Sequence, residues 1–300
     1  MSATADKAPN LTFEILLLGL LALLWGSSYL FIKVAVETIP PFTLIAMRVA
    51  VAGFFLLAVM WGQGARLPAD GRTWRLLLVQ AFFTSAAPWT MVAWGQQYVD
   101  SALAGVLNST SPIFVFFITF FFIRHEAMSG RKLAGALLGI AGVVLIVGVD
   151  ALRGLGQEVA AQLAVLFAAL LYGVAAIHGK RFSHLSPTVT AAGTMICATA
   201  CLVPLSLLVD RPWTLSPSPV SLLSAAALAI FCTGGALLIY FRLVRTLGSM
   251  GVASQAYLRA GVSVLLGVIV LGEQITAVVG LGLLAAVLGV AAINMPARNR

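Results

Sequence analysis

Long apolar segments separated by short polar clusters run along the whole chain. Each segment is close to the about 20 residues that an α-helix needs to cross a bilayer. The pattern predicts ten membrane-spanning helices, over residues 14–36, 41–61, 73–95, 101–122, 131–149, 159–179, 187–208, 219–241, 250–271 and 276–294. Strands of a membrane barrel would instead give weaker segments of about 10 residues with alternating hydrophobicity, and this pattern is absent.

The pattern repeats itself after 147 residues without a gap. Under this shift Trp25 aligns with Tyr172, and Glu126 aligns with Glu273. An internal repeat in so apolar a chain is typical of a transporter whose site lies between its two halves. We therefore expect one five-helix repeat over residues 1–148 and a second over residues 149–300.

The composition also indicates a membrane protein, because 61% of the 300 residues are hydrophobic and only 9% are charged. Soluble domains are about half apolar and about a quarter charged, so a soluble core could not bury this much apolar surface. The first apolar segment has no small-residue cleavage site with a soluble domain behind it. We expect it to be the first span and not a signal peptide.

Positive charges are distributed unevenly between the predicted loops. With the amino terminus inside, thirteen Lys and Arg residues lie on the cytoplasmic side, and two, Arg153 and Arg211, lie outside. The positive-inside rule then places both termini in the cytoplasm. Because each repeat holds five spans, the second repeat enters the membrane in the opposite orientation. The net charge of +8 reflects this bias and does not indicate nucleic-acid binding, since no basic segment is interleaved with aromatic residues.

Several motifs together resemble the drug/metabolite transporter superfamily and, within it, the EamA-type ten-helix carriers. They are Leu24-Trp25-Gly26-Ser27-Ser28, Arg48, Ser101-Ala102, Pro112 and Leu271-Gly272-Glu273. The chain is most similar to the YddG-type exporters of aromatic and other neutral amino acids. The resemblance implies an all-α integral membrane fold, with ten transmembrane helices in two inverted five-helix repeats around a central cavity. One departure is that Arg259 stands where the repeat would place a second proline.

Polar side chains in the middle of an apolar span are costly, and they usually line a cavity, form pairs or bind a substrate. The first, third, fourth, sixth, eighth and ninth spans carry such groups, so we expect these helices to line the cavity. The predicted substrate-binding residues are Trp25, Ser28, Thr84, Asn108, Thr110, Tyr172, Thr233, Gln255, Tyr257 and Arg259. The predicted hinge or gating residues, each inside a span, are Pro88, Pro112, Gly234 and Gly235.

Arg259 is the most informative of these candidates. A cation near the centre of a span costs about 2.5–3.5 kcal/mol on insertion scales unless another group compensates for it. All ten acidic residues lie at span ends, in loops or in the tail, so none can pair with Arg259 at mid-depth. We expect its guanidinium to bind the carboxylate of an amino-acid substrate. The alternative is that it binds backbone carbonyls near the broken fourth span or extends towards an interface.

Trp25 and Tyr172 lie at equivalent depths in the two repeats. They could stack on an aromatic substrate or hold its ammonium group by a cation–π interaction. They could equally pack as large rings against small residues of neighbouring helices. Trp89, by contrast, lies nearer a span end, where the interfacial aromatic belt explains it. Lys33 and Arg48 lie on adjacent helices in the outer half of the membrane, with Glu37 close by. We expect an electrostatic pair at the extracellular rim, and a substrate role is the alternative.

The sequence contains no catalytic constellation, metal-ligand spacing or phosphate-binding loop, so we predict neither an enzyme nor a cofactor. Without a carboxylate at mid-depth, a facilitative mechanism with alternating access is the simplest expectation. The predicted function is export of a small molecule, an aromatic or other neutral amino acid, across a bacterial inner membrane. The lipid bilayer and the substrate are the expected partners, and the oligomeric state stays open. The alternatives are a carrier of nucleotide sugars, phosphorylated compounds or neutral drugs, and an intramembrane enzyme.

Overall fold

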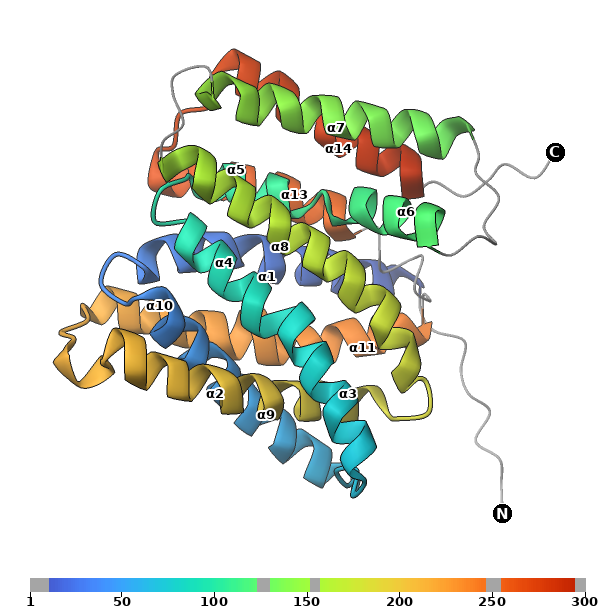
Figure 1. Cartoon of the computed structure of the whole chain (residues 1–300), viewed down its shortest axis with the longest axis vertical. Coiled ribbons are helices and arrows are strands. Elements are labelled where there is room, and N and C mark those ends of the chain that lie inside the picture. The colour runs from blue at the N-terminus through green and yellow to red at the C-terminus, as the bar shows by residue number, and fades with distance from the viewer. Residues whose placement is uncertain (1–10, 123–129, 152–156, 247–254, 295–300) are drawn as a thin grey trace.

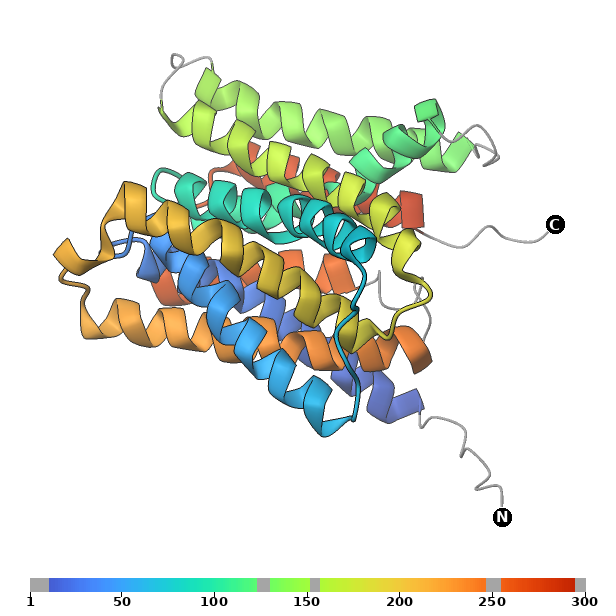
Figure 2. The ribbon, with the colours of Figure 1, turned by 60° about the horizontal axis from the view of Figure 1, so that its bottom comes forward.

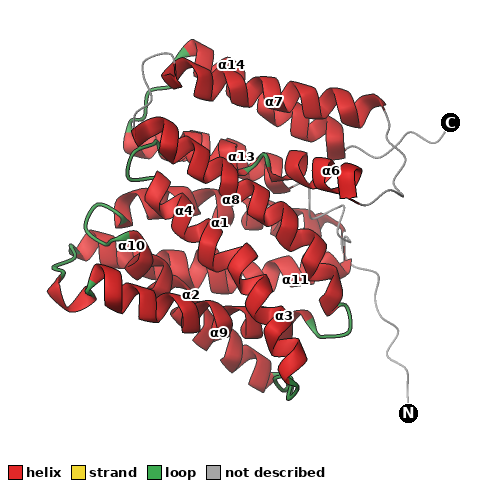
Figure 3. Cartoon of the chain, in the orientation of Figure 1, coloured by secondary structure: helices red, strands yellow, loops and turns green. Residues whose placement is uncertain are grey.

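The chain folds into ten helical rods, one for each predicted span, in a computed structural model that describes residues 11–122, 130–151, 157–246 and 255–294. Within these residues the structure consists of helices and loops, without strands (Figure 3). The rods that are single α-helices are α1 (Leu11–Ala35), α2 (Pro41–Gly62), α7 (Gly130–Ala151), α8 (Gln157–Gly179), α13 (Gln255–Leu271) and α14 (Ala277–Asn294).

The other rods contain a change of backbone geometry. They are α3 (Gly71–Ala81), η1 (Phe82–Ala86) and α4 (Ala87–Gly95); α5 (Ser101–Asn108) and α6 (Ser111–Phe122); α9 (Pro187–Leu205) and η3 (Ser206–Asp210); and α10 (Pro219–Ala229), η5 (Ile230–Gly235) and α11 (Ala236–Thr246). The segments η1, η3 and η5 are π-helical. Wider turns of this kind are frequent at functional sites.

Seven described helical stretches are long and apolar enough to cross a membrane. The remaining predicted spans hold the shorter apolar helices Leu133–Leu145, Leu258–Leu271 and Ala277–Gly289. Large apolar side chains also point outward, among them Phe54 and Leu208, which are 76% and 75% exposed. Such exposure is unfavourable in water but suits contact with lipid. The protein is therefore an all-α integral membrane protein.

Helices from the two halves of the chain pack against each other. The most extensive contacts pair α7 with α14, α2 with α9, α1 with α13 and α4 with α8. The pair α7 and α14 lies along the top edge in Figure 1, and Figure 2 shows α2 running beside α9. α1 begins and α14 ends at the same end of the bundle, on the right in Figure 1. This arrangement fits ten crossings of the membrane.

The predicted hinge residues all lie at the irregular parts of these rods. Pro88 follows the π-helical segment η1, and Gly234 and Gly235 end η5. A proline has no amide hydrogen to donate to the preceding turn, so the helix must adjust there. Pro112 is the second residue of α6, which follows a break at residues 109–110 that divides the predicted fourth span into two helices. Their use as hinges remains a prediction.

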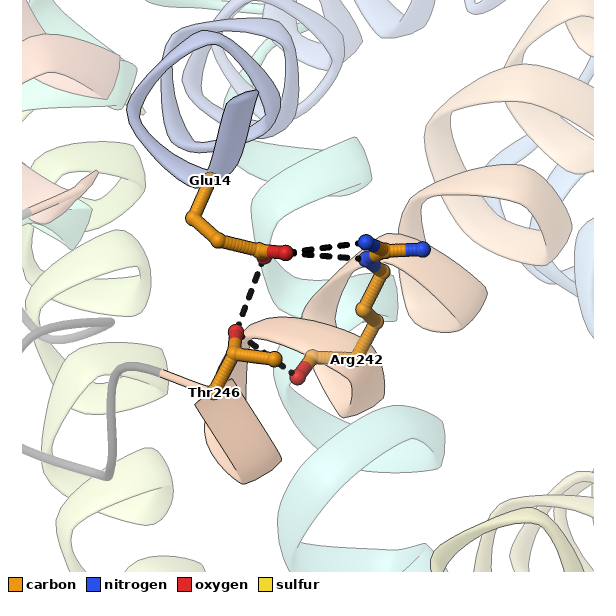
Figure 4. Close-up of polar contacts among 3 residues, drawn as sticks. All are labelled: Glu14, Arg242 and Thr246. Atoms are coloured by element: carbon orange, nitrogen blue, oxygen red, sulfur yellow. Dashed lines mark hydrogen bonds and ion pairs between the residues drawn. The ribbon is translucent and has the colours of Figure 1, made fainter. Parts of the chain in front are cut away.

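An ion pair joins the two halves of the chain at the end where α1 begins. The Arg242 Nη2 and Nε atoms donate to Glu14 Oε1 at 2.9 and 3.3 Å, and Thr246 Oγ1 donates to Glu14 Oε2 at 2.8 Å (Figure 4). The Glu14 side chain is fully buried, whereas that of Arg242 is 53% exposed. The contact thus fixes the start of α1 against the end of α11.

At the opposite end, two carboxylates of the second half cap helices of the first. Glu273 accepts hydrogen bonds from the Ser101 and Ala102 amides at 2.7 and 2.9 Å, at the start of α5. Asp210 Oδ2 accepts from the amide and the hydroxyl of Thr43 at 2.7 and 2.9 Å, at the start of α2. Negative charge is favourable at helix amino termini, so both contacts hold the halves together at this end.

Asp100 lies beside the Glu273 cap, and its titration should be visible in the pH dependence of stability. Partial burial, together with the Glu273 charge, raises the pKa of the Asp100 carboxyl above its ordinary value. For an acid whose pKa is raised on folding, stability falls as the pH rises from the unfolded pKa, about 3.9, through the native pKa. Asp100→Asn should remove this loss, so its melting temperature should exceed that of the wild type above this window.

Asn is a suitable replacement because the Asp100 side chain makes no capping hydrogen bond to α5. The measurement is the thermal unfolding midpoint of both proteins in detergent, followed from about pH 4 upward. An Asp100→Asn protein with the same pH profile as the wild type would contradict the prediction.

Candidate functional site

Polar side chains gather where the fourth rod breaks between α5 and α6. Asn108, the last residue of α5, is 4% exposed and donates from Nδ2 to the Tyr29 hydroxyl at 2.7 Å. Tyr172 of α8 lies beside the same amide and within electrostatic reach of Tyr29, Arg48 and Arg259. We define the central polar cluster as Tyr29, Arg48, Asn108, Tyr172, Thr233 and Arg259. It draws on α1, α2, α5, α8, η5 and α13.

Arg48 of α2 points into this cluster. It is 5% exposed, and its Nε atom donates to Thr233 Oγ1 at 2.8 Å. The Arg48 Cζ atom lies 3.8 Å from the centre of a Trp89 ring, which is cation–π geometry. The expected rim group of Arg48 with Lys33 is therefore wrong, because Lys33 Nζ instead donates to the Val99 carbonyl at 2.8 Å. Trp89, which was expected in the interfacial belt, instead packs against the buried Arg48 guanidinium.

Arg48 carries the same insertion cost as Arg259 and could have been identified from it. Arg48 is the eighth residue of α2, so it too is a cation well inside a span. Lys33 and Glu37 are apparent partners for Arg48 at the rim, and they favoured a rim position over an inward one. Nothing in the sequence showed that the Arg48 side chain turns away from them and towards η5.

Arg259 lies half-buried at the break in the fourth rod. Its Nη2 atom is 3.4 Å from Ser109 Oγ, which is a long hydrogen bond. Its Nε atom is buried without a partner among the described residues. Arg259 thus contacts the broken helix, near where one alternative placed it, but through a serine hydroxyl. The structure also holds it close enough to interact electrostatically with Tyr172.

Several predicted binding residues donate their hydroxyl hydrogen bonds to backbone carbonyls of their own helix. Ser28 Oγ donates to the Trp25 carbonyl at 2.6 Å, Thr84 Oγ1 to the Gln80 carbonyl at 2.6 Å, and Thr110 Oγ1 to the Leu107 carbonyl at 2.6 Å. These hydroxyls compensate for the cost of a polar group in an apolar environment. None of the three contacts a member of the central polar cluster through a described hydrogen bond.

The remaining predicted residues lie in different settings. Trp25 packs against Tyr240 of α11, with ring centres 5.4 Å apart, beside the buried Leu21. Gln255 is 8% exposed, and its Oε1 atom has no partner among the described residues. The Tyr257 side chain lies outside the described residues, although its backbone belongs to α13. The structure therefore brings Asn108, Tyr172, Thr233 and Arg259 together, but links neither Trp25 nor Gln255 to them.

A cavity of about 650 Å³ lies elsewhere, between α2, α4, α8 and α9. Its walls are almost wholly apolar and include Phe42, Thr90, Met91 and Cys201, with Asp210 at one side. None of the residues that line it belongs to the central polar cluster. Among the described residues, no group of three His, Cys, Asp or Glu side chains could hold a metal ion.

Comparison with known proteins agrees with this architecture. The EamA-like transporter family matches residues 12–148 and 159–295. The Uncharacterized inner membrane transporter YedA of Escherichia coli K12 is 26% identical over 265 residues, which cover 88% of this chain and 84% of YedA. An uncharacterized transporter of Archaeoglobus fulgidus is 30% identical over 251 residues, covering 81% of this chain and 84% of that protein.

A solved crystal structure shows the same fold. It superposes with a TM-score of 0.65 at 21% sequence identity, and the match covers 95% of this chain and 98% of that one. The names of the two relatives say that they are transporters, but they specify no substrate.

Proposed function

The chain belongs to the EamA-like transporter family, and from this premise we propose that it exports aromatic and other neutral amino acids. It is a membrane transporter with a small-molecule substrate. We further propose that it lies in a bacterial inner membrane with both termini in the cytoplasm, as the charge bias of the loops predicts. In this proposal residues 1–148 and 149–300 form the two inverted repeats.

The observation that carries the amino-acid assignment is an uncompensated positive charge inside the bundle. Arg48 and Arg259 both act electrostatically on Tyr172, yet neither forms an ion pair with a carboxylate within the described part of the chain. A buried cation without a counter-charge favours binding of an anionic group. A zwitterionic amino acid supplies one carboxylate, and Tyr172 and Trp89 offer aromatic surface nearby.

The second guanidinium also gives weight to one alternative. Recognition of a phosphate calls for several converging Lys or Arg side chains, and the structure places two near Tyr172 where the sequence had indicated one. A carrier of phosphorylated compounds, such as nucleotide sugars, is therefore the second candidate. The two candidates differ in net charge, because a neutral amino acid carries none whereas a phosphorylated compound is an anion.

We propose that transport is facilitative and proceeds by alternating access. The described acidic side chains lie at helix ends or in loops, so none is placed to relay a proton at mid-depth. The irregular segments at Pro88, Pro112 and Gly234-Gly235 are the proposed hinges, since weakened backbone hydrogen bonding lets a helix bend. The caps by Glu273 and Asp210 would open when the opposite end closes.

A counterflow assay with purified protein in liposomes tests this function. Vesicles loaded with unlabelled L-tryptophan, L-methionine or L-threonine should take up the labelled form of the same amino acid. Equally loaded liposomes that lack the protein should not. UDP-glucose-loaded vesicles provide the comparison for the phosphorylated class. Uptake with UDP-glucose alone would replace the amino-acid assignment by the alternative. An imposed pH gradient that drives amino-acid accumulation would overturn the facilitative mechanism.

A further inference from the structure

We propose that Arg48 binds the carboxylate of the transported amino acid, and that Trp89 and Thr233 hold its guanidinium in the orientation this requires. The proposal rests on the proposed function, since it needs a substrate with a carboxylate. It makes Arg48 the anchor of the substrate, in place of the Arg259 that the sequence favoured.

Two contacts from different helices fix the Arg48 guanidinium. The Arg48 Cζ atom lies over a ring of Trp89 in α4, 3.8 Å from the ring centre. Thr233 of η5 accepts from Nε at 2.8 Å. The ring contact restricts the position of the guanidinium, and the hydrogen bond restricts its rotation. The side chain therefore holds one orientation before a substrate arrives.

Thr233 is itself held as a hydrogen-bond acceptor. Its hydroxyl donates to the Leu228 carbonyl at 2.8 Å, across the wider turn of the π-helical segment. A hydroxyl has one hydrogen, so this bond leaves only lone pairs to face Arg48. The irregular backbone of η5 thus orients the Thr233 hydroxyl, and this hydroxyl orients the Arg48 guanidinium.

The end of the guanidinium is left available. Neither Nη atom of Arg48 donates a hydrogen bond within the described residues. Neither is among the described side-chain polar atoms that are fully buried and lack a hydrogen-bond partner, so both stay accessible to a ligand. These two nitrogens form the edge that binds a carboxylate with two parallel hydrogen bonds. Tyr172, Cys232 and Tyr29 lie near Arg48.

The Arg259 guanidinium is not fixed by two such contacts. No aromatic ring is described over its guanidinium, and its described hydrogen bond, to Ser109, is 3.4 Å long. A loosely held side chain must lose rotamer freedom when it binds a ligand, whereas a fixed one has already lost it. For equal charge, Arg48 is therefore the better carboxylate site.

The test compares substrates with and without the carboxylate charge. L-Tryptophan and L-tryptophanamide compete with labelled L-tryptophan in counterflow, and the ratio of their half-inhibiting concentrations reports recognition of the carboxylate. Two charge-assisted hydrogen bonds should give the wild type a preference of at least about 100-fold for the acid. Arg48→Gln should reduce this ratio to about ten or less, because only the charge of Arg259 then acts on the carboxylate.

Further variants keep the proposal testable if Arg48→Gln does not fold. Arg48→Lys keeps the charge but not the two-nitrogen edge, and Thr233→Val removes only the orienting acceptor. Each should lower the ratio about tenfold. Arg75→Gln, which removes an exposed arginine of α3, is the matched control and should leave the ratio unchanged.

The outcomes separate the two proposals. A wild type that transports none of the amino acids refutes the proposed function. Tryptophan transport with wild-type ratios in Arg48→Lys and Thr233→Val refutes only the role of Arg48. A ratio near one in Arg259→Met, with Arg48→Lys unaffected, would assign the carboxylate to Arg259.

Discussion

Gly289→Val should prevent most of the protein from folding into a stable transporter. A Cβ atom on Gly289 would lie 2.5 Å from the Gly135 carbonyl oxygen and 2.5 Å from the Gly139 nitrogen. Both are backbone atoms of α7, so no side-chain rotation can make room, and α7 and α14 would have to separate. Overpacking costs about 1–3 kcal/mol and occasionally more, and a clash with backbone belongs at the upper end.

The membrane environment explains why α7 and α14 pack so closely. Lipid tails are as apolar as leucine, so helices associate there through close van der Waals packing of small residues. Gly142 repeats the arrangement from the other side, because its Cβ would lie 2.5 Å from the Ala286 nitrogen. A branched side chain at either position would remove that packing over several turns.

The matched control is Gly19→Val, since a Cβ on Gly19 of α1 meets nothing within 4 Å. The yield of monodisperse protein in detergent and its thermal unfolding midpoint are the measurements. Gly19→Val should behave like the wild type. Equal yields and midpoints for the two variants would show that the α7 and α14 contact contributes little to stability.

The helices could be predicted from the sequence because their limits are chemically marked. Apolar stretches gave the ten spans, and Pro41, Pro187 and Pro219 begin helices where those stretches begin. Gly142 and Gly289, in the fifth and tenth spans, lie where small residues let two membrane helices approach closely. Pro88, Pro112 and the Gly234-Gly235 pair predict the irregular backbone of three rods, those of the third, fourth and eighth spans.

The rotation of each helix about its axis could not be predicted in the same way. A helix in lipid is apolar on its outer and its inner face, so periodicity does not show which side faces the protein. Arg48 illustrates the consequence, since its position in the sequence suited a rim contact as well as an inward one. Trp25 illustrates it too, because its ring packs with Tyr240, a residue that the 147-residue repeat does not relate to it.

Arg259→Met should raise the half-saturating concentration of L-tryptophan about tenfold without raising that of L-tryptophanamide. Arg48 and Arg259 both lie within electrostatic range of Tyr172, so both charges act on the space around this residue. At an effective dielectric constant of about 20, a unit charge about 8 Å from a carboxylate contributes about 2 kcal/mol. The substrate ammonium opposes part of this attraction, which reduces the expected effect to about tenfold.

Arg259→Lys separates an effect of charge from one of geometry. If Arg259 acts through its charge across the site, lysine should restore nearly wild-type affinity at this position. At position 48 lysine should not, because there the two-nitrogen edge of the guanidinium makes the contact. Equal losses in Arg259→Lys and Arg259→Met would contradict the charge argument and point to direct bidentate binding by Arg259. The same counterflow assay measures both variants, with thermal unfolding midpoints as the check that each is folded.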